Sequence, residues 1–226
     1  MDMQNNMPTG FAFQLSMNEN AMKNFAKMTE DEKIQTLETV NAVSDGFRIL
    51  QEQRMGALVV FERETKLGDI ISTGTVVDSV PTASIVGNIF FNKAPLHDGA
   101  MIIRNNKVYA AGCILPLSQR SNIDSDLGTR HRAAIGMSEN SDAVVVVLSE
   151  ETGMFSIAIN GQIVRFTNLT EFTSNLVRIL APEGQEDDGN GKFSFSNIPN
   201  YFSQAFKIKT DKKKNSEAED ENEEQE

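Results

Sequence analysis

The sequence predicts an α/β fold, a single globular domain in which helices flank a central mixed β-sheet of about seven strands. Three observations favour this class. Apolar side chains recur at helical spacing between Ile34 and Leu50. Ala143–Leu148 is a continuous, Val-rich apolar run, which is typical of a strand buried on both faces. Asn160-Gly161 separates two short apolar segments and is the strongest hairpin signal in the chain.

The chain of 226 residues has room for one domain and two flanking segments. Residues 1–28, rich in Met, Asn and Gln, predict a loosely ordered arm, and residues 29–182 predict the folded domain. Residues 183–226 carry 12 acidic and 6 basic side chains, a net charge of −6. A short aromatic patch between Phe193 and Phe206 could dock weakly on the domain, but Lys209–Glu226 is a block of charges with too little apolar surface to fold. We expect this acidic tail to be largely disordered.

Composition excludes several classes of protein. The net charge of −11 argues against binding to nucleic acid or to an anionic membrane surface. No apolar run approaches the roughly 20 residues of a membrane-spanning helix. We expect no signal peptide, because the first residues lack a basic segment followed by an apolar stretch. Cys113 is the only cysteine, so no internal disulfide can form, and its apolar surroundings predict a core residue. We expect a cytoplasmic chain, or the cytosolic part of a membrane-anchored protein.

Periodicity and turn residues predict the elements of the first half of the domain. Thr29, followed by two acidic residues, is typical of a helix start, and Gly56 is expected to end this helix. A buried strand is predicted at Ala57–Phe61 and a polar turn at Glu62–Leu67. Two short extended segments follow at Asp69–Ser72 and Thr75–Val77, and then a helix at Thr82–Phe91.

The second half begins with a predicted hairpin around Asn105-Asn106. Its strands are expected at Met101–Arg104 and Ala110–Leu115, followed by a polar loop at 119–126. Gly128 and Thr129 predict a turn and the N-cap of the next helix. The buried strand follows at Ala143–Leu148, then a turn at Ser149–Gly153, the second hairpin at Met154–Phe166 and a last helix at Glu171–Leu180. Thr170 is the predicted cap of the last helix.

A basic motif opens the helix after the polar loop. Arg130, His131 and Arg132 lie in its first turn, where acidic residues are usually preferred because the backbone N–H groups there carry partial positive charge. Extra positive charge at this point favours a docked anion such as a phosphate chain. The alternative is a solvated basic turn with no ligand.

A second motif, His97-Asp98-Gly99-Ala100, lies where a turn enters a strand. Asp98 could activate a hydroxyl group or hold a metal ion, and Gly99 would let a ligand approach the backbone. The alternative for Asp98 is an Asx-turn that closes the loop. His97 could likewise bind a metal or cap the turn.

Together, Pro95–Ala100 and Gly128–Ala134 resemble the diadenylate cyclase (DAC) domain. That family is marked by an Asp-Gly-Ala motif and an Arg-His-Arg motif at about this separation, and the similarity extends over about two thirds of the chain. It implies the condensation of two ATP molecules into cyclic di-AMP with release of two pyrophosphates. The similarity is greatest to the membrane-bound branch of the family, which has transmembrane helices before the first long helix; this sequence has none.

The resemblance also implies roles for individual residues. Catalysis is assigned to Asp98, Arg130 and Arg132, and metal binding to His97 and Asp98, with Mg²⁺ or Mn²⁺ as the ion. ATP binding is assigned to Gly99, Ala100, Leu115, Gly128, Thr129, Arg130, His131, Ser149 and Glu151. Some residues of the basic motif could instead hold the loop in shape.

Each DAC domain takes one ATP, so the resemblance implies a face-to-face homodimer for ring closure, with higher oligomers open. It implies no nucleic-acid partner, and membrane contact only if the chain is part of an anchored protein. Two other functions compete. A non-catalytic sensor of adenine nucleotides would not need the Asp98 carboxylate, and a scaffold acting through the acidic tail would leave Arg130 and Arg132 without a purpose.

Overall fold

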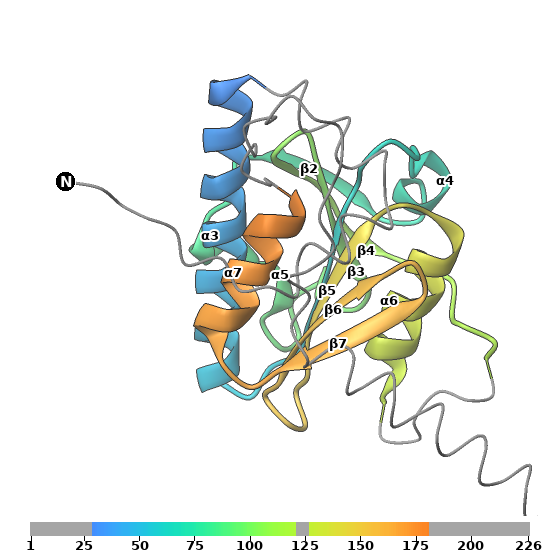
Figure 1. Cartoon of the computed structure of the whole chain (residues 1–226). Coiled ribbons are helices and arrows are strands. Elements are labelled where there is room, and N and C mark those ends of the chain that lie inside the picture. Colours follow the sequence, from blue (N-terminus) through green and yellow to red (C-terminus); the bar gives the residue numbers. More distant parts are fainter. Residues whose placement is uncertain (1–28, 121–126, 181–226) are drawn as a thin grey trace, which may run out of the picture. The chain divides into compact units, whose positions relative to one another are not determined.

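The computed structural model describes residues 29–120 and 127–180, which fall within one compact unit, Thr29–Ala181 (Figure 1). The predicted arm at 1–28, the acidic tail and most of the polar loop at 119–126 lie outside the described residues. Within the described ranges, no helix combines the length and the apolar character needed to cross a membrane.

A single mixed sheet of seven strands forms the centre of the unit, as the sequence predicts. Its strand order is β2-β4-β3-β1-β5-β6-β7. β1 and β3 are parallel, and every other neighbouring pair is antiparallel. The strands are β1 (Ala57–Phe61), β2 (Thr75–Ser79), β3 (Ala100–Arg104), β4 (Lys107–Cys113), β5 (Val144–Leu148), β6 (Phe155–Ile159) and β7 (Gln162–Phe166). The central strands β1 and β5 are buried along their whole length, which explains why both are continuous apolar runs.

Helices cover both faces of this sheet (Figure 1). α3 (Glu30–Glu52), α5 (Ala83–Phe90) and α7 (Leu169–Leu180) pack on one face, where the ring of Phe172 stacks on those of Phe47 and Phe155. α4 (Gly68–Ile71) and α6 (Thr129–Asn140) pack on the other face. Cys113 is completely buried, so its predicted place in the core is confirmed, and this burial raises the pKa of its thiol to about 11.

The long first helix, α3, begins where the sequence predicts. The Thr29 hydroxyl accepts the N–H of Glu32, while the Glu32 carboxylate accepts the N–H of Thr29 at 2.7 Å, so two otherwise unpaired donors are satisfied. The predicted end at Gly56 is wrong, because the helix stops at Glu52 and Arg54 takes the left-handed conformation (φ 54°).

The prediction of an extended segment at Asp69–Ser72 is wrong as well, because these residues form most of the short helix α4 and its C-cap. Leu67 and Ile71, four residues apart, are both buried on the sheet, a spacing that suits a helical turn. The hydroxyl groups of Ser72 and Thr73 donate to the carbonyls three residues earlier and close this turn.

The caps of the last two helices also differ from the prediction. α6 is capped by Gly128 without a side-chain hydrogen bond, and Thr129 is its first helical residue. α7 starts at Leu169, and the Asn168 side-chain oxygen accepts the N–H groups of Thr170 and Glu171, so Thr170 is not the cap.

Both predicted hairpins are confirmed. Asn105 and Asn106 have φ of 50° and 57°, and Asn160 and Gly161 have φ of 52° and 71°. Positive φ at both central residues is the geometry of the two-residue turn that suits the strand twist.

Candidate active site

Strand direction brings loops from distant parts of the sequence to one edge of the sheet. β1 and β3 start at the edge where β4 and β5 end, because the register pairs Ala57 with Leu148 and Ala100 with Cys113. We call this edge the Asp98 edge; it comprises Gly56 and residues 98–100, 113–115 and 149–151. The predicted site residues next to β3 and β4 (residues 98–100 and Leu115) therefore lie at the same edge as those in the turn after β5 (Ser149 and Glu151).

The basic start of α6 lies at the same edge. Arg130 Nη1 is 2.8 Å from Glu150 Oε2, in the turn after β5. Gly56, just before β1, faces this pair, since a Cβ on Gly56 would lie 2.5 Å from Arg130 Nη1 and 3.2 Å from Glu150 Oε2. The start of α6, the predicted anion site, is thus in direct contact with the turn after β5 through Arg130 and Glu150, and Gly56 lies next to this pair.

Asp98 is exposed at this edge. The part of the chain that the structure describes gives its carboxylate no hydrogen bond or ion pair, so no Asx-turn engages it. His97 is different, because its Nδ1 lies 2.6 Å from the carbonyl oxygen of Ala94. If Nδ1 carries the proton, Nε2 keeps its lone pair free for a proton or a cation.

The structure gives a reason for glycine at position 99 that the sequence did not suggest. Its φ is 108°, and a Cβ there would lie 2.7 Å from the carbonyl oxygen of Cys113 on β4. Glycine is therefore needed for the close approach of two backbones at the mouth of β3. This requirement exists whether or not a ligand approaches.

The three residues of the basic motif have different surroundings. The Arg130 side chain is 28% exposed and faces the Asp98 edge. Arg132 Nη2 donates to the carbonyl of Ser118 at 3.1 Å, so this guanidinium group holds the segment after β4. His131 is buried, and burial together with nearby Arg165 and Arg130 lowers its pKa, so the ring is neutral at neutral pH.

Comparison with known proteins defines the family. The family model described as "DAC: DisA bacterial checkpoint controller nucleotide-binding" matches residues 44–163, more than half of the chain. The chain belongs to the DAC family. It is 44% identical over 133 residues to "Cyclic di-AMP synthase CdaA" of Bacillus subtilis, covering 59% of this chain and 48% of that one. It is 45% identical over 124 residues to "Diadenylate cyclase CdaS" of Bacillus thuringiensis, covering 55% and 62%.

A solved DAC structure has the same fold. The crystal structure of DacA from Staphylococcus aureus, a double cysteine mutant, superposes with a TM-score of 0.62 at 41% identity, covering 67% of this chain and 99% of that one. The chain spans about half the length of the first of the curated relatives it matches. The α/β fold with a seven-stranded mixed sheet is thus the DAC fold.

Asp98 and His97 are the residues of the Asp98 edge that could hold a divalent cation. Residues 29–120 and 127–180 contain no cluster of three or more His, Cys, Asp or Glu able to hold a metal ion. Mg²⁺ typically takes one or two carboxylates and completes its shell with substrate phosphates and water. Asp98, with His97 Nε2 beside it in the sequence, offers donors of this limited kind.

Two residues of the edge were not predicted from the sequence. Glu150 pairs with Arg130, whereas its neighbours Ser149 and Glu151 were the predicted ones. The Ser149 hydroxyl accepts the N–H of Thr152 at 3.2 Å and thereby shapes the turn. Gly56 was predicted only as a helix end, although a glycine just before a buried strand is a signal for close packing.

The other predicted binding residues line or border the edge. Ala100, the first residue of β3, and Leu115, two residues after the end of β4, are both buried. Gly128 and Thr129 are exposed at the start of α6. The backbone N–H groups of His131 and Arg132 bond to the Gly128 carbonyl, so the amides that remain for an anion are the first ones of the helix. Glu151 is exposed in its turn.

Proposed function

We propose that the chain is a diadenylate cyclase, which condenses two ATP molecules into cyclic di-AMP and releases two pyrophosphates. Membership of the DAC family supports this function, and so does the naming of two relatives as a cyclic di-AMP synthase and a diadenylate cyclase. The observation that carries the proposal is the exposed Asp98 carboxylate, without a partner among the described residues. It lies at the sheet edge that also holds Arg130 and the start of α6, which has no side-chain cap.

In the proposed reaction, the 3′-oxygen of one ATP attacks the α-phosphorus of the other. A new oxygen–phosphorus bond forms, the bond to the pyrophosphate oxygen breaks, and pyrophosphate leaves with the electron pair. The proton of the 3′-hydroxyl passes to the Asp98 carboxylate, which acts as general base. A second condensation of the same kind closes the ring.

The remaining residues of the edge bind and orient the triphosphate. Arg130 and the first amides of α6 would neutralise charge on the phosphates, which is the main contribution a protein makes to phosphoryl transfer. Arg132 supports them through Ser118, and Leu115 borders the adenine. Mg²⁺ or Mn²⁺ bound by Asp98, His97 and the phosphates would add positive charge where negative charge develops.

Ring closure requires two active sites. Each DAC domain is expected to hold one ATP at its Asp98 edge. That ATP must therefore meet the attacking hydroxyl of an ATP held by another copy. We propose that two copies face each other about a two-fold axis. Specific activity should therefore fall when the protein is diluted below its dimerisation constant.

Asp98→Asn tests this proposal, with Asp78→Asn as its matched control. Loss of a general base lowers kcat by about 10²- to 10⁴-fold. ATP affinity measured without added metal should change little, because the Asp98 carboxylate would contact the phosphates only through the ion. Asp78 is an exposed carboxylate on β2 that pairs with Lys107, and its φ of 47° suits Asn equally well. Equal turnover of Asp98→Asn and Asp78→Asn would overturn the role of Asp98. ATP binding without any product from the unaltered chain would favour the nucleotide sensor.

A further inference from the structure

The segment that follows Leu115 lies along α6. We call Pro116–Arg120 the strap. The Ser118 backbone N–H donates to the carbonyl of Arg132 at 3.0 Å, and Arg132 Nη2 donates back to the Ser118 carbonyl at 3.1 Å. The contact is close, because a Cβ on Gly136 would lie 2.5 Å from the Ser118 nitrogen. Ser118 itself is buried.

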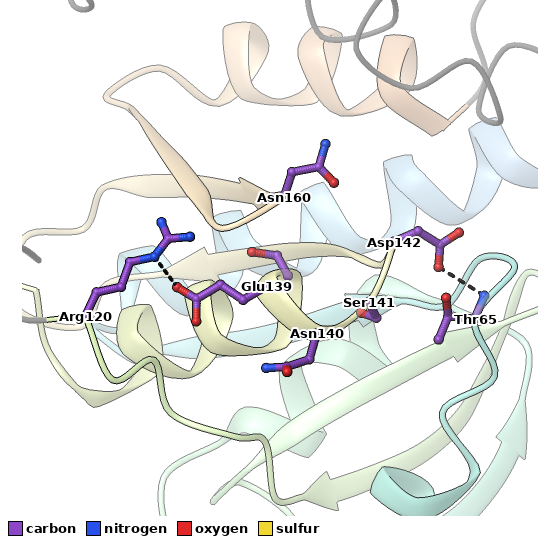
Figure 2. A pocket seen from close by; sticks show the side chains of 8 residues that line it. Thr65, Arg120, Glu139, Asn140, Ser141, Asp142 and Asn160 are labelled. Atoms are coloured by element: carbon purple, nitrogen blue, oxygen red, sulfur yellow. Dashed lines mark hydrogen bonds and ion pairs between the residues drawn. The ribbon is translucent and has the colours of Figure 1, made fainter.

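Glu139, on the last turn of α6, holds the other end of the strap. The Ser118 hydroxyl donates to Glu139 Oε1 at 2.7 Å, and Arg120 Nε lies 2.9 Å from the same oxygen (Figure 2). Arg120 Nη1 also donates to the carbonyl of Gly161, in the β6–β7 turn, at 2.8 Å. The Glu139 side chain is only 19% exposed, so these charge-assisted bonds are partly shielded from water.

We propose that Glu139 is a positioning residue for the nucleotide site. It touches none of the reacting groups, and this role rests on the proposed cyclase function. By fixing Ser118 and Arg120, Glu139 keeps the strap on α6. The strap in turn fixes Leu115, on the predicted adenine side, relative to Arg132 and the start of α6, on the predicted phosphate side.

The same surface provides a matched control. Asp142 lies with Glu139 around one shallow depression, but it points to the other side of it (Figure 2). Its two carboxylate oxygens accept the N–H groups of Glu64 and Thr65 at 3.0 Å each. Asp142 therefore holds the turn after β1 and has no bond to the strap.

The test compares Glu139→Gln with Asp142→Asn in the full chain, by ATP titration and by turnover. A looser strap should raise both the Kd and the KM for ATP about tenfold, with kcat changed less than twofold, because the strap acts on ground-state binding. Asp142→Asn should leave both constants within twofold. A melting temperature measured for each variant separates positioning from a general loss of stability.

Ser118→Ala provides a second, smaller change that removes the hydroxyl between Glu139 and Arg120. Its effect on ATP affinity should be of the same direction as that of Glu139→Gln. The double variant should be no weaker than Glu139→Gln alone, since both changes break one chain of contacts. This variant carries the test if Glu139→Gln does not fold.

Three results would overturn the role of Glu139. They are an unchanged ATP affinity in Glu139→Gln, an equal change in Asp142→Asn, and effects of Ser118→Ala and Glu139→Gln that multiply. ATP titration needs no turnover, so it tests Glu139 even if the unaltered chain binds ATP and forms no product, which would overturn only the cyclase. Absence of ATP binding in the unaltered chain would overturn both.

Discussion

At the scale of single residues, two glycines of the Asp98 edge have different neighbours. Gly56 faces the tip of the Arg130 side chain, which can move, whereas Gly99 faces the backbone of β4 and has φ of 108°. Gly56→Ala should therefore displace Arg130 and raise the KM for ATP by about tenfold, with a change in unfolding free energy below about 1 kcal/mol. Urea unfolding and steady-state kinetics measure the two effects.

Gly99→Ala provides the contrast. A Cβ there meets backbone atoms of Gly112 and Cys113, so we expect a loss of about 2 kcal/mol or more in unfolding free energy. If Gly56→Ala lost as much stability as Gly99→Ala while its KM stayed unchanged, the contact between Gly56 and Arg130 would be a packing contact only.

A buried ion pair that the sequence did not suggest stabilises the opposite end of β1 and β3. Arg104 Nη2 lies 2.6 Å from Glu62 Oε2, and the Glu62 side chain is 1% exposed. Arg104→Met should lower the unfolding free energy by about 2 kcal/mol at pH 7, because Glu62 loses two charge-assisted hydrogen bonds and keeps only the Leu67 N–H and Lys66 Nζ, 3.5 Å from Oε1. Urea unfolding checks this value.

The same pair has a pH signature. Burial raises the pKa of Glu62, but hydrogen bonds from Arg104 and from the Leu67 N–H outweigh it and lower the pKa overall. A lowered pKa in the folded state gives stability that is present above the unfolded pKa, about 4.3, and is lost as the pH falls through the folded pKa. The loss caused by Arg104→Met should therefore shrink in acid. Lys107→Met, in an exposed pair, should cost less than about 1 kcal/mol at any pH. Equal losses in both variants would contradict the account.

At the scale of elements, the residue that caps α7 in the structure differs from the one predicted from the sequence. Asn168 accepts two backbone N–H groups, whereas Thr170, the predicted cap, lies inside the helix. Asn168→Ala should lower the unfolding free energy by about 1 kcal/mol, and Thr170→Ala by less than about 0.5 kcal/mol. Thermal or urea unfolding of the two variants decides between them, and the reverse order would restore Thr170 as the cap.

Elements with strong local signals were predictable from the sequence. The Val-rich run gave β5 almost to the residue, and both Asn-containing turns were correct. The short helix α4 was not predictable, because four residues are too few to show a period, and burial of Leu67 and Ile71 against the sheet decides their conformation. The start of α7 was misplaced by two residues because Asn168 and Thr170 are both good caps.

At the scale of the whole molecule, both motifs were visible in the sequence, but only the resemblance to the DAC domain placed them at one site. Whether Asp98 and Arg130 share an edge depends on β1 being parallel to β3 and antiparallel to β5, which no local pattern encodes. For the same reason, the sequence did not show which residues of the basic motif face the Asp98 edge and which hold neighbouring backbone in place. Arg132 holds the strap only because the chain from β4 returns along α6.

The central claim is that two copies of this chain join two ATP molecules at their Asp98 edges. The most direct measurement incubates the purified chain with ATP and Mn²⁺ or Mg²⁺, and quantifies cyclic di-AMP by chromatography and pyrophosphate by a coupled assay. The account predicts two pyrophosphates for each cyclic di-AMP, formed at a rate that rises faster than in proportion to protein concentration while the dimer is dissociated. ATP bound without either product, with both metals and at high protein concentration, would contradict it.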